Sequence, residues 1–335
     1  MSEPRKHHYV PVFYQKHFAD SKGLFWVYDR RLKSYKQLPP TVVCFEKDLY
    51  ALKPTDGGPR DRRVETKGLS QVDGVGATAI RDLLFGNPNT ETIRAVSFFM
   101  GVQFSRLPSM GRSLGAMYVQ AGREMMRLMT ASVDRMKGVL EKYARDTGES
   151  IGVSAESMVA AVRENQIEVL ANEVPFLNHL FSQAEDLSNV VEQLEWQLLI
   201  SPPETGFITC DSPVTVVPPM GTKAVGFGIP GAVKYFPLAR QFCLRVGDVG
   251  FRFTKRKVSE DTVQIVNWNI AANSEHFIMG PDKAQLQSVV RSSQSEDEDS
   301  SPRFTVEVQD QNDDGSLQKI TFQPRRYFYR KSAAP

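Results

Sequence analysis

Residues 196–217, WQLLISPPETGFITCDSPVTVV, decide the fold class of this chain. Short apolar runs are separated here by prolines and a glycine, which is the pattern of buried strands joined by turns. From about residue 63 to 195, apolar side chains instead recur at helical spacing, and further strands are predicted from residue 233 onwards. Strands, a helical block and strands in this order predict an α+β fold rather than a doubly wound parallel sheet.

We therefore expect a central, mostly antiparallel sheet formed by N- and C-terminal segments, with a large helical block inserted between them. The 335 residues fit one domain with three parts. Residues 1–60 hold an N-terminal motif, a short helix and a hairpin, 61–195 form the helical block, and 196–331 are mixed and rich in strands. An acidic loop at 292–301, which contains no apolar residue, is expected to be mobile.

The helical block contains two strong patterns. Between Thr90 and Leu107 apolar residues recur every three or four positions, and Thr90 is the expected N-cap. Residues 113–145 contain no proline and predict one long amphipathic helix. Six methionines lie between residues 110 and 136, and their flexible thioether side chains suit either ordinary core packing or the docking of a partner.

The composition is that of an ordinary globular protein. Forty-one Lys and Arg stand against 39 Asp and Glu, and a net charge of +2 argues against a broad basic field for nucleic acid, although nucleic acid stays open as a partner. The three cysteines lie far apart without paired spacing, so we expect reduced thiols. The chain shows neither a secretory apolar segment nor an uninterrupted apolar run of membrane length, which predicts a cytoplasmic protein without a membrane partner.

The segment His7-His-Tyr-Val-Pro11 is the strongest candidate for chemistry near the N-terminus. A neutral imidazole can bind a metal or act as a general base near pH 7. Adjacent residues of an extended segment point to opposite sides, so a turn at residues 9–11 would be needed to bring His7 and His8 to one site. His17, from the predicted helix that follows, would add a third imidazole to a divalent metal site.

The residues from His7 to Tyr14, with Phe18-Ala-Asp20, resemble the start of a bacterial family of unknown function, domain of unknown function 4238. The resemblance continues in the family's order through 24–29, 46–50, 103–108, 207–214 and 236–238. The family's usual Leu-Arg is replaced here by Gln15-Lys16, and its Ser-Asp-Asn-Pro by Cys210-Asp-Ser-Pro213. The resemblance implies homology over most of the chain and no particular reaction.

A second candidate motif ends the predicted strand at Asp211 and Ser212. Reactive groups are often placed at such connections, and Asp211 could supply the carboxylate that the histidines lack. Alternatively, Asp211 hydrogen-bonds the backbone of a turn before Pro213. The two motifs lie some 200 residues apart, so only the fold can bring them together.

Two arginines are candidates for binding an anion. Arg106 ends the clearest predicted helix, where it could bind a ligand or oppose the helix dipole, and Arg240 follows a strand. The predicted substrate-binding set consists of Arg106, Arg240, Tyr9, Tyr14 and Ser212. Residues 325–331 mix four cations with three aromatics, which suits either single-stranded nucleic acid or the solvated end of a strand.

The order His-His-x-x-Pro also resembles the entry to His-Asn-His nucleases, in which a histidine activates water beside a metal. The chain departs from that pattern, because no asparagine lies between Asp20 and Gly86 and a helix is expected directly after Pro11. A Walker phosphate loop, a dinucleotide fingerprint, a Gly-x-Ser-x-Gly elbow and a His-Glu-x-x-His motif are all missing from the sequence, which removes many familiar enzyme classes.

Two hypotheses follow. The first is a metal-assisted hydrolase of the nuclease or phosphodiesterase type, in which His8 is the base, and His7 and Asp211, with His17, hold a divalent metal. Arg106 or Arg240 would then stabilise the developing phosphoryl charge. The second is a non-catalytic binding protein, in which the histidine motif is a structural clasp and the long Met-rich helix docks a partner.

Overall fold

The computed structural model describes residues 5–54, 58–219, 226–250 and 252–293, together with the backbone of 304–311 and 317–322. The chain divides into two compact units: unit 1 is Met1–Met110 with Leu177–Pro335, and unit 2 is Gly111–Phe176. Strands at both ends of the chain and helices between them confirm the expected α+β class. The expectation of a single domain stays a prediction.

The N-terminal part of unit 1 consists of short elements. They are β1 (Lys6–His8), α1 (Val12–Lys16), β2 (Phe25–Asp29), β3 (Ser34–Leu38), a 3₁₀ turn (Pro40–Val42) and β4 (Phe45–Lys47). Strands β1 and β4 pair antiparallel, and β2 and β3 form the expected hairpin. Pro11 precedes the first residue of α1, so the helix begins directly after the histidine motif.

The first large sheet joins the two ends of the chain, as predicted. Its order is β3-β2-β11-β6, with β6 at Thr209–Cys210 and β11 at Phe277–Gly280. Strand β11 lies antiparallel to both neighbours and places Phe277 opposite Asp29. Segments almost 250 residues apart in sequence are therefore neighbours in space.

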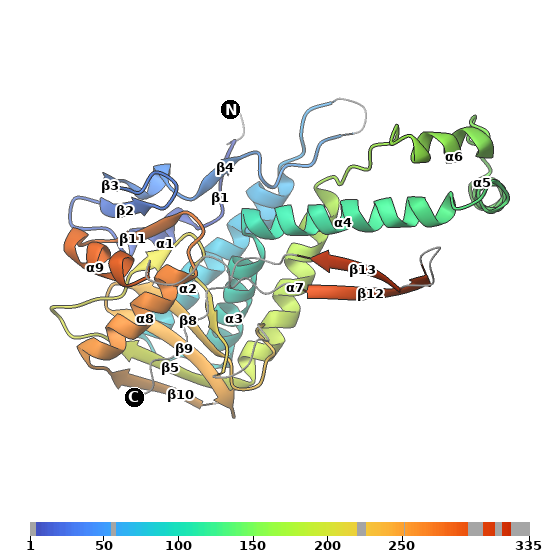
Figure 1. Ribbon diagram of the computed structural model, residues 1–335. Coiled ribbons are helices and arrows are strands. Elements are labelled where there is room, and N and C mark those ends of the chain that lie inside the picture. The colour runs from blue at the N-terminus through green and yellow to red at the C-terminus, as the bar shows by residue number, and fades with distance from the viewer. Residues whose placement is uncertain are drawn as a thin grey trace. The chain divides into compact units, whose positions relative to one another are not determined.

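A second sheet of five strands comes entirely from the C-terminal part of the chain (Figure 1). Its order is β10-β5-β9-β8-β7, with β5 at Leu194–Ile200, β7 at Thr215–Val217, β8 at Val233–Ala239, β9 at Phe242–Val249 and β10 at Arg252–Lys257. Strand β10 runs parallel to β5, and the other neighbouring strands are antiparallel. Prolines and turns on either side of β6 and β7 end these short strands, as the opening stretch of sequence predicts.

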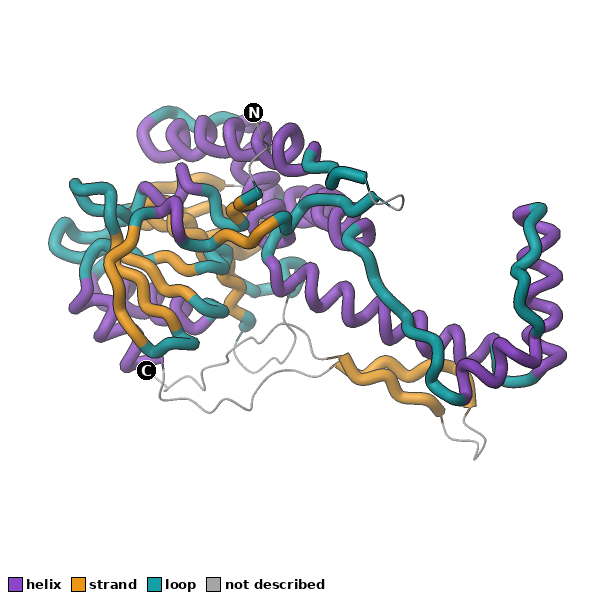
Figure 2. Tube along the Cα trace, turned by 90° about the horizontal axis from the view of Figure 1, so that it is seen from above, coloured by secondary structure: helices purple, strands orange, loops and turns teal. Residues whose placement is uncertain are grey.

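The helices of unit 1 flank its strands on two sides (Figure 2). They are a π-helical turn (Val64–Leu69), α2 (Ser70–Phe85), α3 (Thr90–Ser105), the start of α4 (Pro108–Met129), most of α7 (Val174–Glu192), α8 (Glu260–Ala272) and α9 (Lys283–Ser293). Asn89, rather than the expected Thr90, is the N-cap of α3, because the Asn89 side chain accepts the Thr92 N–H in a capping box. Ser259 caps α8 as predicted.

Each face of the five-stranded sheet packs against helices. On one face Leu199 and Cys243 share a core with side chains of α8 and α9, including Val263 and Leu286. On the other face the ring of Phe236 lies 6.0 Å from that of Phe99 on α3. The sheet is therefore the middle layer of unit 1.

Close helix packing in this layer depends on small residues. A Cβ atom added at Gly101 of α3 would collide with the backbone carbonyl of Ala184 on α7. Glycine is therefore required at this position for the two helices to approach so closely.

Unit 2 is helical, and it contains the rest of α4, then α5 (Val133–Thr147) and α6 (Ala155–Arg163). The expected single helix over 113–145 is wrong, because the Ser132 side chain accepts the Arg135 N–H and starts a new helix. A small core forms around Met136 and Val159. Pro108 is the single fully buried residue of α4, and the remaining residues of this helix are half-buried or exposed.

The remaining segments were predicted in part. Strands β12 (Phe304–Gln311) and β13 (Leu317–Phe322) pair antiparallel, as expected for the last hairpin. Most of the predicted acidic loop and all of residues 325–331 lie outside the described residues. Cys44, Cys210 and Cys243, all within the described residues, are buried and form no disulfide, which agrees with the expected reduced thiols. Within the described part of the chain, every helix is too short or too polar to cross a membrane.

Candidate functional site

His7 is buried in the N-terminal motif, and its imidazole forms a hydrogen bond with the backbone. Its Nδ1 atom accepts a hydrogen bond of 3.0 Å from the N–H of Tyr50. The imidazole also stacks on the Tyr50 ring, with 5.8 Å between the centroids. Because β1 is extended, His7 points inward and His8 to the other, partly exposed side. The motif therefore does not present the two imidazoles to one site.

His8 is half-buried and lies beside the carbonyl oxygen of Thr41, 3.3 Å from its Nε2 atom. A proton on Nε2 would be donated to that carbonyl and would leave Nδ1 as an acceptor. Burial lowers the pKa of His8 below its ordinary value, and the cationic Lys6 and Arg106 act in the same direction. His8 is therefore neutral near pH 7.

Arg106 is completely buried, and its guanidinium hydrogen-bonds the backbone of the histidine motif. Its Nε atom donates to the carbonyl of Tyr9 over 2.9 Å, and Nη1 donates to Asp73 over 2.8 Å. Gln103 donates to the same Tyr9 carbonyl and accepts from Nη2 of Arg106. The guanidinium thus binds groups of the protein itself, and the carbonyl of Tyr9 is fixed by two side chains.

Two carboxylates beside Arg106 were missed by the sequence reasoning. Glu65, in the π-helical turn, and Asp73, in α2, both interact electrostatically with this arginine. The Glu65 Oε2 atom is buried and has no hydrogen-bond partner among the residues that the structure describes. Burial raises the pKa of Glu65 to about 7, against the opposing effect of Arg106. The sequence gives no signal for this group, because its three members come from separate helical segments.

Tyr14 and His17 fasten α1 to β8. The Tyr14 hydroxyl donates to the carbonyl of Pro237 over 2.6 Å and lies 2.9 Å from Thr209 Oγ1. The His17 Nδ1 atom lies 2.8 Å from the carbonyl of Leu238. Arg240 is exposed, and its backbone N–H donates to the carbonyl of His17. The structure therefore places Tyr14 and His17 in structural contacts and leaves the Arg240 side chain at the surface.

Asp211 is buried and binds the backbone that leads into β11. Oδ1 accepts the N–H of Glu275 over 2.9 Å, and Oδ2 accepts those of His276 and Phe277 over 2.6 and 3.1 Å. Burial and the neighbouring Glu275 raise the pKa of Asp211 to about 6, although the three hydrogen bonds act to lower it. Asp211 therefore binds backbone N–H groups, but those of a segment more than 60 residues away and not those of a local turn before Pro213.

Ser212 takes part in the same buried connection. Its carbonyl accepts from the Asn273 side chain over 2.7 Å, and its hydroxyl accepts from the same amide nitrogen over 2.9 Å. Asp211 and Ser212 together tie the end of β6 to the end of α8. Ser212 is buried and does not face a surface where substrate could bind.

The structure does not assemble the predicted metal ligands. Over residues 5–54, 58–219, 226–250 and 252–293, no three His, Cys, Asp or Glu side chains gather closely enough to hold a metal ion. His7, His17 and Asp211 each bind different backbone groups instead. The residues present therefore do not fit a divalent metal at the predicted place.

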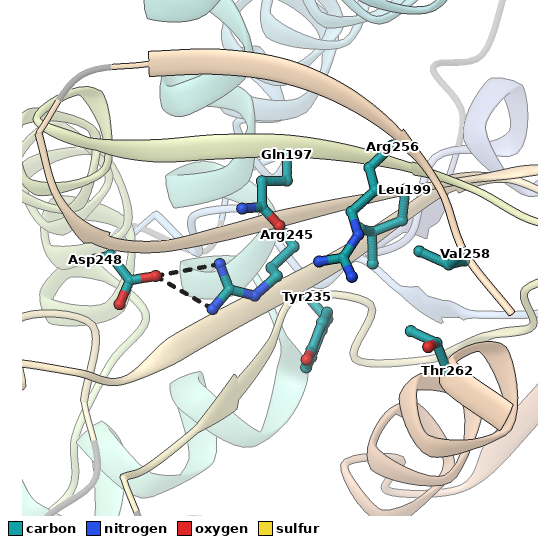
Figure 3. Close-up of a pocket in the computed structure, with 8 residues that line it drawn as sticks. All are labelled: Gln197, Leu199, Tyr235, Arg245, Asp248, Arg256, Val258 and Thr262. Carbon is teal, nitrogen blue, oxygen red and sulfur yellow. Dashed lines mark hydrogen bonds and ion pairs between the residues drawn. The ribbon is translucent and has the colours of Figure 1, made fainter.

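A cavity of about 260 Å³ lies on one face of the five-stranded sheet, beside the start of α8 (Figure 3). Arg245 of β9 and Arg256 of β10 reach it from the two strands that flank β5. The other lining residues are Gln197, Leu199, Tyr235, Asp248, Val258 and Thr262. Two guanidinium groups, an amide and two hydroxyl groups thus surround one small space.

Strand register explains how this cavity forms. Gln197 of β5 lies opposite Arg245 of β9, and Arg245 lies opposite Tyr235 of β8. These three side chains form a row across the sheet and share one face. Alternation along a strand could have shown that Gln197 and Leu199 share a face, but the partners across the row follow only from the pairing.

Arg245 is held in place by groups of the cavity wall. Its Nη1 and Nη2 atoms lie 3.4 and 3.3 Å from Oδ2 of Asp248, and its charge acts on the Tyr235 side chain, which lies opposite it in register. The Asp248 side chain is 58 % exposed, so this ion pair lies at the rim of the cavity. Burial raises the pKa of Tyr235 above its ordinary value, which keeps its hydroxyl protonated and able to donate.

Comparison with known proteins gives one match. A family model described as "Protein of unknown function (DUF4238)" matches residues 6–284. No curated protein and no solved structure matches the chain. The matched range contains the histidine motif, Arg106, Asp211 and every residue that lines the cavity.

Proposed function

Since the chain belongs to the DUF4238 family, whose description assigns no function, we propose one from the cavity itself: the protein binds a small anion of the phosphate type between Arg245 and Arg256. The observation that carries this proposal is the convergence of two guanidinium groups on a cavity of about 260 Å³. A planar guanidinium matches the oxygen atoms of phosphate with two parallel hydrogen bonds, which an ammonium group cannot form.

The neutral lining residues support the same ligand class. Tyr235 and Thr262 can donate through their hydroxyl groups, and Gln197 can donate through its amide. Leu199 and Val258 supply an apolar wall beside these donors. A few convergent polar groups within a partly apolar cavity are typical of small-molecule sites.

The contacts of the histidine motif favour the second of the two sequence hypotheses over the first. His7 and Asp211, the proposed metal ligands, accept hydrogen bonds from backbone N–H groups. Arg106 binds Tyr9 and Asp73 and is not accessible to a phosphoryl group. We therefore propose that the motif is a structural clasp, and that binding takes place at the cavity on the sheet.

Titration calorimetry with inorganic phosphate tests this proposal in a chloride buffer of low ionic strength. Arg245→Gln and Arg256→Gln should each weaken binding at least about tenfold, the usual effect of losing a charged hydrogen bond. Arg252→Gln is the matched control, because Arg252 lies on the same strand as Arg256 but outside the cavity lining. Unchanged affinity in both cavity variants, or equal loss in the control, would contradict the proposal.

The hydrolase hypothesis keeps an independent test. Nucleic-acid cleavage can be compared between the wild type, His8→Ala and Asp211→Asn with a broad set of substrates. Cleavage that is lost in His8→Ala, in a variant that is still folded, would restore a catalytic role for this half-exposed imidazole.

A further inference from the structure

Asp248 occupies the rim of the cavity in a way that resembles a bound anion. Both terminal nitrogens of Arg245 approach the same oxygen, Oδ2, at 3.3 and 3.4 Å. A well-formed guanidinium–carboxylate pair uses two oxygens at about 2.7–2.9 Å. The contact is therefore long and one-sided, and an exposed ion pair of this kind contributes little to stability.

The backbone at Asp248 fits a residue that can release its side chain. Asp248 has a φ of 60° at the end of β9, and Gly250 follows with a φ of 117°. Aspartate and asparagine tolerate this left-handed region better than most residues, so it is no reason to expect misfolding when the charge alone is removed. An asparagine at position 248 can thus adopt the same backbone conformation as the aspartate.

The charges around the cavity limit the size of its ligand. Glu195 lies two residues before Gln197, on the same face of β5, and opposite Arg252 in register. Glu260 and Asp261 occupy the exposed first turn of α8, next to Thr262. Gln197 also donates to Glu195 over 3.2 Å, so this carboxylate lies close to the cavity. An extended polyanion would meet all of these carboxylates on leaving the cavity, whereas a compact anion would meet fewer of them.

These observations, together with the proposed anion site on which they rest, define the ligand more closely. We propose that the ligand is a small phosphate monoester, and that Asp248 is a built-in competitor that holds Arg245 until the phosphate replaces it. A phosphate group brings three oxygens and nearly two negative charges at pH 7, and can bond Arg245 and Arg256 together. The Asp248 carboxylate brings one charge and pairs with Arg245.

If Asp248 competes with the ligand for Arg245, removing the charge of Asp248 should raise the affinity for the ligand. Asp248→Asn should bind glycerol phosphate about two- to fivefold more tightly than the wild type in titration calorimetry, which matches the usual strength of an exposed ion pair. Asp186→Asn is the matched control, because it removes the same charge from an exposed position on α7. The wild-type affinity should also rise between pH 5 and 7, as the phosphate monoester gains its second charge near pH 6.

A second measurement distinguishes a phosphate monoester from the phosphodiester backbone of nucleic acid as the ligand. A twelve-nucleotide strand of oligo(dT) without a terminal phosphate should bind at least about tenfold more weakly than glycerol phosphate at equal ionic strength. Tighter binding of the oligonucleotide would overturn the monoester and identify a nucleic-acid site. Unchanged or weaker binding of glycerol phosphate to Asp248→Asn would overturn the competitor.

The failure of this inference differs from the failure of the proposed function. If Arg245→Gln abolishes phosphate binding and Asp248→Asn leaves it unchanged, the anion site stands and the competitor is refuted. If neither the wild type nor Asp248→Asn binds inorganic phosphate or glycerol phosphate, both proposals are refuted. Binding that appears only in Asp248→Asn supports the competitor directly.

Discussion

Replacing Glu65 by glutamine should make the stability of the protein less dependent on pH. In the folded protein burial raises the pKa of Glu65 from 4.5 to about 7. The unfolded chain releases this proton near pH 4.5, so the folded state holds more protons between these two values. The free energy of unfolding therefore falls as the pH rises through that window.

The size of the effect follows from the same values. Each pKa unit corresponds to about 1.4 kcal/mol, which gives roughly 3 kcal/mol for a fully buried carboxyl. Glu65 is partly exposed, and solvent screening reduces the expected contribution to about 2 kcal/mol. Glutamine resembles the protonated carboxyl, so Glu65→Gln should exceed the stability of the wild type by only about 0.5 kcal/mol at pH 5 and by about 2 kcal/mol at pH 8.

Urea denaturation at pH 5, 6, 7 and 8 measures this difference, with the fluorescence of the buried Trp196 as one signal. Glu204→Gln is the matched control, because Glu204 is exposed in a loop of unit 1. Asp211, whose pKa of about 6 acts in the same direction, is present in every protein compared and cancels from the difference. Equal pH dependence in the wild type and Glu65→Gln would refute the reasoning.

Three further predictions concern buried polar groups. Arg106→Lys should destabilise the protein by about 3 kcal/mol in urea, because lysine cannot replace the guanidinium bonds to Tyr9 and Asp73; a loss below 1 kcal/mol would contradict this. Asp211→Asn should cost about 2–4 kcal/mol through its three backbone donors and leave phosphate affinity unchanged, whereas lost binding with intact stability would indicate a direct role. Lys234→Met should raise the melting temperature at pH 7, because burial lowers the pKa of this amine to about 8; the gain should shrink between pH 8 and 10, as the wild type becomes more stable there, and a constant gain would argue against the cause.

The fold class could be predicted from sequence because helical and strand periodicities are local properties. The α+β order and the short C-terminal strands follow from spacing within a few residues. The break between α4 and α5 had a readable signal in Ser132, a good N-cap, which the uninterrupted apolar stripe outweighed. The division of the strands into two sheets had no such signal, because it depends on pairings such as Phe277 with Asp29.

The candidate site was harder to predict, since a short motif can be constrained without being reactive. His7 looks chemically active in the sequence, yet it binds the N–H of Tyr50 in the core. Asp211 finds its donors in residues 275–277, which no local pattern connects with it. No sequence pattern distinguishes Arg245 and Arg256, because they belong to ordinary strands. Only the register of the paired strands places them at one cavity.

The pairing of β2 with β11 also determines when the protein can fold during its synthesis. Residues 25–29 leave the ribosome about 250 residues before their partner strand does. At typical translation rates this delay is roughly 10–50 s. The Tyr14 hydroxyl, which hydrogen-bonds Thr209 and the carbonyl of Pro237, is made almost as long before these partners. Strand β2 can pair with β3 early in synthesis, but the apolar side chains that it packs against β11 stay uncovered until the end of the chain is made.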